Sequence, residues 1–333
     1  MLLEVAKETE VELLRRVLRE LNIHHIIKKH EDRHLAVVDH MDAALVERLK
    51  EQGLIEAVIQ CPGPHKLVSK AFKEKTIIDI HGVQIGGTGV VMISGPCAIE
   101  SVEQLVETGL ALKEQGVKIM RASAYKPRTS PYSFQGHGEE GLRMHFEAQR
   151  QHGLLTETEV MDPRDVAIAA QYVDILRVGA RNMQNYDLLK ELGKCGKPVI
   201  LKRGLNATID EWLSSAEYIM AYGNDQVILC ERGIRTFETK TRGTLDLSSI
   251  PVLRSLTHLP VIVDPSHAAG RADLVGPLAQ AAVAVGADGL LTEMHPRPKE
   301  SMCDARQALS IEEHKVLREK LAKIAEAIGR SIV

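Results

Sequence analysis

The chain has 333 residues, a length that fits two ordinary domains or one barrel of about 250 residues with additions. Hydrophobic residues make up 44% of the sequence and charged residues 26%, which excludes a disordered chain. The 42 Lys and Arg against 45 Asp and Glu leave a net charge of −3, and aromatic residues are only 3%. Neither a basic excess nor a base-stacking surface is present, so we expect no nucleic-acid partner.

The cysteines and the N-terminus indicate where the protein works. The cysteine count is odd and no Cys-x-x-Cys pair occurs, which argues against a secreted disulfide framework. The first nine residues carry Glu4, Lys7 and Glu8 and do not resemble a signal peptide. No apolar run approaches the roughly 18 residues of a membrane span. We expect a soluble cytoplasmic protein with no membrane partner.

Residues 1–66 have a pattern of their own. The expected elements are a strand (2–6), a helix (10–21), two strands (24–29 and 34–40), a helix (43–52) and a strand (55–60). Each helix places its apolar residues on one face, and the polar residues 31–33 predict a turn between the middle strands. The order βαββαβ is that of a ferredoxin-like domain. The Cys-Pro-Gly-Pro run at 61–64 is typical of a linker, so we expect a domain boundary after residue 66.

Strands and helices alternate through the rest of the chain, residues 67–333. A hairpin is expected first, over residues 76–85. Eight strands follow, at 91–96, 118–122, 154–160, 174–178, 198–202, 226–230, 261–264 and 289–293, each followed by a helical stretch. Eight strand–helix units over about 245 residues match a (β/α)8 barrel, whereas an open doubly wound sheet usually has five or six strands. A Gly-x-Gly-x-x-Gly run at 136–141 follows a loop rather than a strand, so we do not interpret it as a dinucleotide site.

Possible metal ligands gather where the barrel strands end, which is where such barrels carry their chemistry. They are Cys97, His267, Glu293 and Asp304. A mixed set of sulfur, nitrogen and oxygen donors suits a divalent transition metal, whereas Mg²⁺ or Ca²⁺ would prefer oxygen ligands alone. Each of these residues by itself is more often a buried or solvated side chain than a ligand. Their convergence on one face of the barrel is what predicts a metal site.

Basic residues converge at the same strand ends. They are Arg121, Lys126, Arg128, Arg181, Lys202, Arg232 and Arg235. Cations this close would repel one another unless an anion is bound, and arginine matches carboxylate and phosphate well. Arginines at strand ends could instead pair with Glu157, Glu159 or Glu231. The set exceeds the need of one phosphate, so it indicates a substrate with a phosphate and a carboxylate, or two phosphorylated substrates.

Seven ordered motifs carry a resemblance to a known family. They are GPCAIES from residue 95, KPRTS from 126, VGARNMQN from 178, LKRG from 201, CERGIRTFE from 230, DPSHAAGR from 264 and TEMHP from 292. Over essentially the whole chain they resemble 3-deoxy-D-arabino-heptulosonate 7-phosphate (DAHP) synthase, in the short type I branch related to 3-deoxy-D-manno-octulosonate 8-phosphate (KDO8P) synthase. The resemblance implies condensation of phosphoenolpyruvate with D-erythrose 4-phosphate, which gives DAHP and phosphate. That reaction is the first step of the shikimate pathway of aromatic amino-acid biosynthesis.

The resemblance also implies roles for individual residues. It implies a divalent metal ion of the Mn²⁺, Fe²⁺, Zn²⁺ or Co²⁺ class and no organic cofactor. The implied metal ligands are Cys97, His267, Glu293 and Asp304. Contacts with phosphoenolpyruvate go to Arg121, Lys126, Arg181, Lys202 and Arg232. The aldose phosphate site goes to Arg128, Thr129 and Ser130. We expect Lys126 to transfer a proton, with Cys97 and His267 as catalytic ligands and Asp264 also at the substrate site.

Alternatives remain for the substrate and for the first domain. KDO8P synthase acts on arabinose 5-phosphate and resembles KANR where this chain has Lys126-Pro127-Arg128, which favours the four-carbon aldose. In this family residues 1–66 resemble a regulatory module through which tyrosine or phenylalanine inhibits, although a domain that only supports oligomerisation fits as well. A chorismate mutase is discounted, because that fold is all-helical. The resemblance further implies a homotetramer. Cys303, next to Asp304, is placed to form a disulfide with Cys97 when metal is absent.

Overall fold

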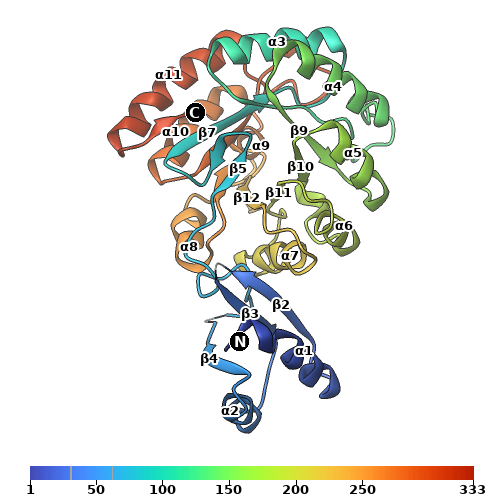
Figure 1. The fold of residues 1–333 in the computed structure, drawn as a ribbon. Helices are drawn as coiled ribbons and strands as arrows, with labels where there is room; N and C mark the ends of the chain where they lie inside the picture. The colour runs from blue at the N-terminus through green and yellow to red at the C-terminus, as the bar shows by residue number, and fades with distance from the viewer. Residues whose placement is uncertain (31, 62) are drawn as a thin grey trace. The chain divides into compact units, whose positions relative to one another are not determined.

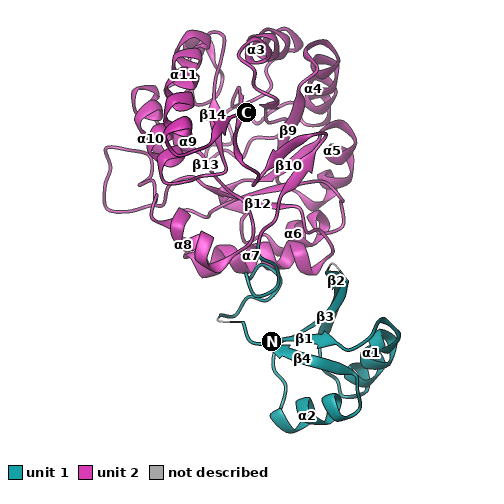
Figure 2. Ribbon diagram, turned by 60° about the vertical axis from the view of Figure 1, so that its left-hand side comes forward, with its two compact units in different colours: residues 1–74 teal, residues 75–333 magenta. Residues whose placement is uncertain are grey.

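The computed structural model describes residues 1–30, 32–61 and 63–333, which form two compact units, 1–74 and 75–333 (Figures 1 and 2). Glu31 of the predicted turn and Pro62 of the predicted linker lie outside the described residues. The first unit continues past residue 66 to Glu74. In this extension Leu67 and Val68 are fully buried, and the ring of Phe72 stacks on His30 with 5.3 Å between ring centroids.

The first unit is an antiparallel sheet with two helices. Its elements are β1 (Leu2–Val5), α1 (Val11–Glu20), β2 (His25–His30), β3 (Arg33–Val38), α2 (Ala43–Glu51) and β4 (Ile55–Ile59). The strands lie in the order β2-β3-β1-β4, and every neighbouring pair is antiparallel. The predicted ferredoxin-like βαββαβ order is therefore confirmed. The helices bury Leu14, Leu18 and Leu49 in a core that they share with Leu3 and Val38 of the sheet.

The second unit is a closed parallel barrel, as predicted. Its strands are β7 (Gly89–Gly95), β8 (Ile119–Arg121), β9 (Leu155–Val160), β10 (Ile175–Val178), β11 (Val199–Lys202), β12 (Val227–Glu231), β13 (Val261–Val263) and β14 (Gly289–Glu293). Each strand pairs in parallel with the next, and β14 pairs with β7 to close the ring. The strands are buried along nearly their whole length, because the barrel interior covers one face and the helices the other.

Helices surround the barrel (Figures 1 and 2). They are α3 (Val102–Glu114), α4 (Glu139–His152), α5 (Val166–Tyr172), α6 (Tyr186–Leu192), α7 (Ile209–Ala221), α8 (Ser249–Leu256), α10 (Ala272–Ala284) and α11 (Ile311–Ala327). Capping boxes at Thr208 and Ser310 fix the starts of α7 and α11. Two short elements differ from the prediction. A five-residue helix, α9 (Pro265–Ala269), follows β13, and β15 (Ser331–Ile332) pairs with β7.

A hairpin closes the end of the barrel where the strands begin. It consists of β5 (Ile78–Ile80) and β6 (Val83–Ile85), and its apolar side chains join the aliphatic cluster of the barrel interior. The hairpin leaves the opposite end, where the strands finish, for polar side chains.

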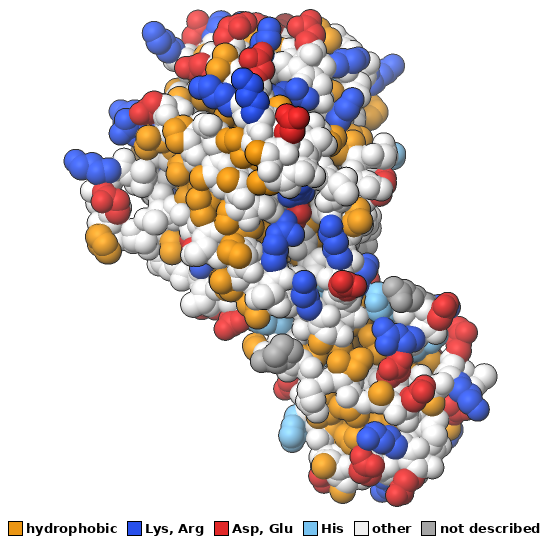
Figure 3. Space-filling model, turned by 90° about the vertical axis from the view of Figure 1, so that its left-hand side faces the viewer, with side chains coloured by type: hydrophobic (Ala, Val, Ile, Leu, Met, Phe, Trp, Pro, Cys, Tyr) orange, Lys and Arg blue, Asp and Glu red, His pale blue; other side chains and the backbone are white. Residues whose placement is uncertain are grey.

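Charges of both signs are interspersed over the visible face of each unit (Figure 3). In the described part of the chain, no helix is long and apolar enough to cross a membrane.

Candidate active site

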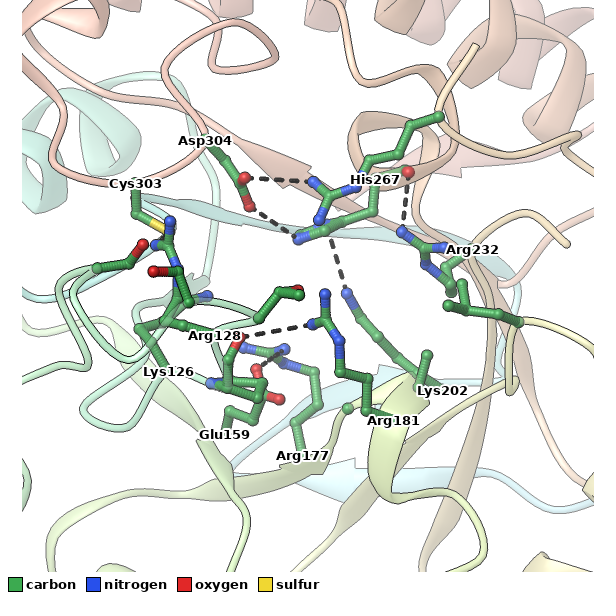
Figure 4. A pocket seen from close by; sticks show the side chains of 18 of the residues that line it. Lys126, Arg128, Glu159, Arg177, Arg181, Lys202, Arg232, His267, Cys303 and Asp304 are labelled. Carbon is green, nitrogen blue, oxygen red and sulfur yellow. Dashed lines mark hydrogen bonds and ion pairs between the residues drawn. The ribbon is translucent and has the colours of Figure 1, made fainter. Parts of the chain in front are cut away.

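A cavity of about 370 Å³ lies at the end of the barrel where the strands finish (Figure 4). Residues on or after each of the strands β8 to β14 line it. Eight of the described lining side chains are Lys or Arg, and only Glu159 and Asp304 are acidic. Figure 4 shows Lys126, Arg181 and Lys202 pointing toward the same space, with His267 and Asp304 along its edge. The cavity is therefore built to hold an anion.

The four predicted metal ligands meet beside this cavity. One ligand atom from each of Cys97, His267, Glu293 and Asp304 lies within 4.8 Å of all the others. His267 Nε2 lies 3.4 Å from Glu293 Oε1 and 3.7 Å from Asp304 Oδ2, and Cys97 Sγ lies 3.3 Å from the same Asp304 oxygen. The barrel strands and their loops thus bring together residues that are up to 207 positions apart.

Helix α9 orients His267 for ligation. Asp264 caps this helix and accepts a hydrogen bond from the backbone N–H of His267 at 2.8 Å. Its Oδ2 also lies 2.7 Å from His267 Nδ1, and Lys202 Nζ bonds to the same oxygen. Burial lowers the pKa of His267 to about 4, so the ring is neutral. With the proton on Nδ1, the lone pair of Nε2 points toward the space between the other ligand atoms, where a metal ion would bind, which is the arrangement of metal-binding histidines.

The donor set fits a transition metal. Glu293 Oε1 is buried and has no hydrogen-bond partner among the described residues, although Arg121 Nη1 lies 3.2 Å away. A buried carboxylate oxygen without a donor is costly unless a cation satisfies it. Its second oxygen accepts a hydrogen bond from Gln307 Nε2 at 2.7 Å, which leaves Oε1 turned toward His267. One thiol, one imidazole and two carboxylates are the soft and hard donors that such metals accept together.

The predicted site residues, both substrate contacts and metal ligands, fall into two groups. Those that line the cavity are Lys126, Arg128, Thr129, Ser130, Arg181, Lys202, Arg232, Arg235, His267 and Asp304. Arg121 and Asp264 are instead fully buried, as Glu293 is, and Cys97 is nearly so. Arg121 donates to the carbonyl oxygen of Cys97 at 3.2 Å and sits beside Glu293, so it contacts the ligand group directly.

Lys126 joins the basic cavity to the ligand group. Its Nζ donates to Cys97 Sγ at 3.0 Å and to the carbonyl oxygen of Cys97 at 3.3 Å. Burial would lower the pKa of Lys126, but nearby Cys97 and Glu159 hold it above its ordinary value. Lys202 behaves differently, since burial lowers its pKa despite the neighbouring Asp264. The two lysines of the cavity therefore differ in how firmly they hold their protons.

Two arginines at strand ends are satisfied by carboxylates, as the alternative interpretation allowed. Arg177 donates to Glu157 at 2.7 Å, to Glu159 at 2.9 Å and to Ser123 at 2.7 Å. Arg203 donates to Glu231 at 2.9 Å and to Asp246 at 2.8 Å. Neither arginine was among the predicted anion contacts. The charges of these two buried arginines are therefore already paired with carboxylates.

Sequence reasoning gave no site role to four residues. Glu159 and Arg242 line the cavity, Gln307 bonds to Glu293, and Glu100 bonds to the loop that carries Asp304. Arg242 Nη1 lies 3.2 Å from Asp304 Oδ1 and donates to Gln307 Oε1 at 3.0 Å. Gln307 in turn donates to Glu293, so one chain of contacts links both carboxylate ligands. Glu159 could have been found, because it lies two residues after Glu157 on the same face of β9. The other three lie in loops, where no periodicity marks them.

Comparison with known proteins agrees with this site. The model of the DAHP synthetase I family matches residues 71–330. A phospho-2-dehydro-3-deoxyheptonate aldolase of Thermotoga maritima is 47% identical over 306 residues, which cover 92% of this chain and 90% of that protein. A 2-dehydro-3-deoxyphosphooctonate aldolase of Syntrophotalea carbinolica is 32% identical over 268 residues, covering 74% of this chain and 95% of that protein.

Solved structures extend the likeness to the fold. The crystal structure of the Thermotoga maritima DAHP synthase superposes with a TM-score of 0.80 at 43% identity, over 100% of this chain and 99% of that one. A truncated form of the Thermotoga maritima enzyme superposes with a TM-score of 0.77 at 47% identity, over 81% of this chain and all of that one. With the family model covering well over half of its length, the chain is an enzyme of the DAHP synthetase I family.

Proposed function

We propose that this chain condenses phosphoenolpyruvate with D-erythrose 4-phosphate to give DAHP and phosphate. The observation that carries the proposal is the position of the four-residue ligand group beside a cavity lined by eight basic side chains. Two phosphorylated substrates need many cations, and an aldehyde needs an electrophilic activator. The basic cavity supports the first requirement and the ligand group beside it supports the second, in a chain that belongs to the matching family.

The cations divide the cavity between the two substrates. We assign phosphoenolpyruvate to Arg181, Lys202 and Arg232, which lie at or just after the ends of β10, β11 and β12, and to the buried Arg121 at the end of β8. We assign the phosphate of the aldose to Arg128, Thr129 and Ser130 in the loop after β8. Holding both anions at fixed positions offsets their mutual repulsion and brings the reacting carbons together.

Lys126 lies where these two groups meet, so we propose that it transfers the proton. The methylene carbon of phosphoenolpyruvate attacks the aldehyde carbon, and positive charge develops at its C2. Water adds at C2 and loses one proton, which replaces the proton that Lys126 gives. The C–O bond to phosphate then breaks, the C2 hydroxyl becomes the ketone, and its proton leaves with the phosphate. Lys126 Nζ, next to Cys97, can give a proton to the oxygen of the former aldehyde. Glu159, the acidic residue on the β9 side of the cavity, faces the cations that hold phosphoenolpyruvate.

The ligand group defines the cofactor. Cys97, His267, Glu293 and Asp304 would hold a divalent cation of the Mn²⁺, Fe²⁺, Zn²⁺ or Co²⁺ class. When bound, such an ion acts as a Lewis acid that polarises the aldehyde oxygen. Asp264 and Lys202 keep His267 in the tautomer that such binding needs.

A turnover assay with two aldoses tests the proposal. Purified protein reconstituted with Mn²⁺ is given phosphoenolpyruvate with erythrose 4-phosphate or with arabinose 5-phosphate, and loss of phosphoenolpyruvate and release of phosphate are followed. We expect turnover with the four-carbon sugar. Preference for the five-carbon sugar would assign the chain to the octulosonate reaction of its 32% identical relatives instead. Turnover that survives removal of metal would contradict the metal assignment.

We further propose that residues 1–66 bind tyrosine or phenylalanine and inhibit the barrel. A separate compact unit with a ferredoxin-like sheet supports this role. The test compares inhibition of the full chain with that of residues 75–333. Unchanged inhibition in the shortened chain would leave the first unit an appendage. We also propose a homotetramer in the cytoplasm; sedimentation of the full chain and fractionation of cells that produce it test these two points.

A further inference from the structure

The loop between β14 and α11 carries the ligand Asp304 in a constrained conformation. The chain leaves the barrel after His295 and returns at Leu309, which bridges to Met294. Asp304 has a φ of 53°, in the left-handed region. For most residues other than glycine this conformation costs about 1–2 kcal/mol, and for aspartate it costs less but still more than for glycine. Surrounding interactions must therefore hold the turn in place.

Glu100 supplies such an interaction from the opposite segment of the site. It follows the ligand Cys97 by three residues and directly precedes Ser101, the N-cap of α3. The backbone N–H of Met302 donates to Glu100 Oε1 at 2.9 Å. The Ser301 hydroxyl lies between that oxygen, at 3.3 Å, and the carbonyl oxygen of Cys303, at 2.7 Å. One carboxylate oxygen of Glu100 thus contacts Ser301 and Met302, two consecutive residues that precede Asp304 in the loop.

His295 fixes the orientation of this carboxylate. The backbone N–H of Arg297 donates to His295 Nδ1 at 3.0 Å, which places the ring proton on Nε2. Nε2 faces Glu100 Oε2 at 3.4 Å, and the histidine is buried. Both oxygens of Glu100 are therefore engaged by the loop that carries Asp304. No oxygen of Glu100 needs to reach the ligand group itself.

We propose that Glu100 is a positioning residue for metal binding. It ties residues 301–304 to residues 97–100, so that Asp304 Oδ2 lies 3.3 Å from Cys97 Sγ and 3.7 Å from His267 Nε2. This inference rests on the proposed metal site and adds a residue to it. Without the tie, the strained turn relaxes and the fourth ligand is lost from its place. Partners that orient ligands in this way typically change metal affinity by roughly 10- to 100-fold.

Glu107 offers a matched control. It lies on α3, seven residues after Glu100 in the sequence, and its Oε2 pairs with Arg297 of the same loop at 2.8 Å. Both side chains of that pair are close to half exposed. Exposed pairs contribute little to stability. Loss of Glu107 removes a carboxylate contact between α3 and the same loop without touching residues 301–304.

The experiment is a Co²⁺ titration of metal-free protein, followed by the absorption that a thiolate–cobalt bond produces. The native chain, Glu100→Ala, Glu100→Gln and Glu107→Ala are compared. We expect Glu100→Ala to bind Co²⁺ about 10- to 100-fold more weakly. Glu100→Gln keeps one acceptor oxygen, so its affinity for Co²⁺ should lie between those of Glu100→Ala and the native chain. Glu107→Ala should bind Co²⁺ as tightly as the native chain. Thermal unfolding of the metal-free variants shows that each is folded; if Glu100→Ala is not, Glu100→Gln decides.

Each outcome bears on a distinct statement. Native affinity in both Glu100 variants overturns the positioning role while the metal site stands. Equal weakening in Glu107→Ala also overturns it, since any contact between the segments would then suffice. A native chain that gives no thiolate–cobalt absorption contradicts the proposed metal site itself.

Discussion

The side chain of Lys126 contacts both the basic cavity and the ligand group. Its ammonium donates to Cys97 and also lines the cavity. We predict that Lys126→Met lowers kcat by about 10²- to 10⁴-fold, the usual contribution of a positioned proton donor. Methionine keeps the length of the side chain but has no proton to give. Single-turnover kinetics measures the loss.

A matched variant separates proton transfer from charge. Lys240→Met removes a lysine from the exposed part of the loop after β12 and should leave kcat unchanged. Lys126→Arg should retain binding of phosphoenolpyruvate but not turnover, because the planar guanidinium keeps the charge but cannot be deprotonated or place a donor N–H where the lysine ammonium lies. Near-normal turnover in Lys126→Met would exclude the proton-transfer role.

The neighbouring thiols give a second prediction for individual residues. Cys97 Sγ and Cys303 Sγ lie 3.2 Å apart, and Arg128 donates to Cys303 Sγ at 2.8 Å. We predict that metal-free protein treated with diamide loses two thiols. Each sulfur gives up one proton and one electron, the S–S bond forms, and diamide is reduced to its hydrazine. Thiol counting and mass spectrometry under denaturing conditions measure the change, and bound metal should slow it by occupying Cys97.

Cys303→Ser is the decisive variant for this pair. It removes one partner of the disulfide, so Cys97 should remain a free thiol after diamide treatment. Cys195→Ser removes a thiol outside this pair, so it should lower only the total number of thiols counted. Oxidation at equal rates with and without bound metal would show that Cys97 is not a ligand.

At the scale of elements, the glycines at 136–141 shape the loop that carries the aldose residues. Gly136 has a φ of 90°, and a Cβ there would lie 2.1 Å from the carbonyl oxygen of Ala124. Gly141 lies close to Ala124 as well. These glycines let the loop from Lys126 and the start of α4 approach the backbone after β8. The dinucleotide motif is thus a packing motif in this fold.

We predict that Gly136→Ala costs both stability and activity. The positive φ alone costs about 1 kcal/mol or more, and the clash with backbone forces the loop to move. Gly196→Ala is the control, since it has a φ of 69° but open space around its Cβ position. We expect both to lower the free energy of unfolding, and only Gly136→Ala to raise KM for erythrose 4-phosphate. An unchanged KM in Gly136→Ala would separate the loop from the substrate site.

The elements also show what the sequence can and cannot predict. All eight barrel strands were predictable, because strands such as Val199–Lys202 and Val261–Val263 are buried runs between regular helices. The same order predicted that Cys97, His267, Glu293 and Asp304 converge. Helix α9 was not predicted, since five residues carry no period. The contacts of Glu100 and Gln307 depend on the path of a loop, which side-chain patterns along the chain do not encode.

Across the whole molecule, polar groups are buried well beyond the active site. His314 of α11 is fully buried behind β7, with Nδ1 2.6 Å from Gln115 Oε1 and Nε2 2.8 Å from Ser94 Oγ. Since the amide oxygen only accepts, the ring proton is on Nδ1, and Nε2 accepts from the serine hydroxyl. The ring is satisfied in its neutral form and has no place for a second proton. Helix α11 is thereby fixed to the strand that closes the barrel.

This burial makes the stability of the barrel depend on pH. Burial, with a smaller contribution from nearby Arg318, lowers the pKa of His314 from 6.5 to about 4. Between these values the unfolded chain binds a proton that the folded chain does not. Stability is therefore complete above about pH 6.5 and falls as the pH drops toward 4, by up to about 1.4 kcal/mol per pH unit for this one proton. Fluorescence of the buried Trp212 reports unfolding of the barrel.

His314→Asn removes the titrating group and tests this account. We predict a lower unfolding free energy at neutral pH, because buried hydrogen bonds and packing are lost, but a shallower pH dependence between about pH 6.5 and pH 4. His40→Asn replaces an exposed histidine of the first unit and should keep the native slope. A native slope in His314→Asn would mean that other groups govern the acid sensitivity. A shallower slope shows that the buried contact between α11 and β7 contributes to the acid sensitivity of the barrel.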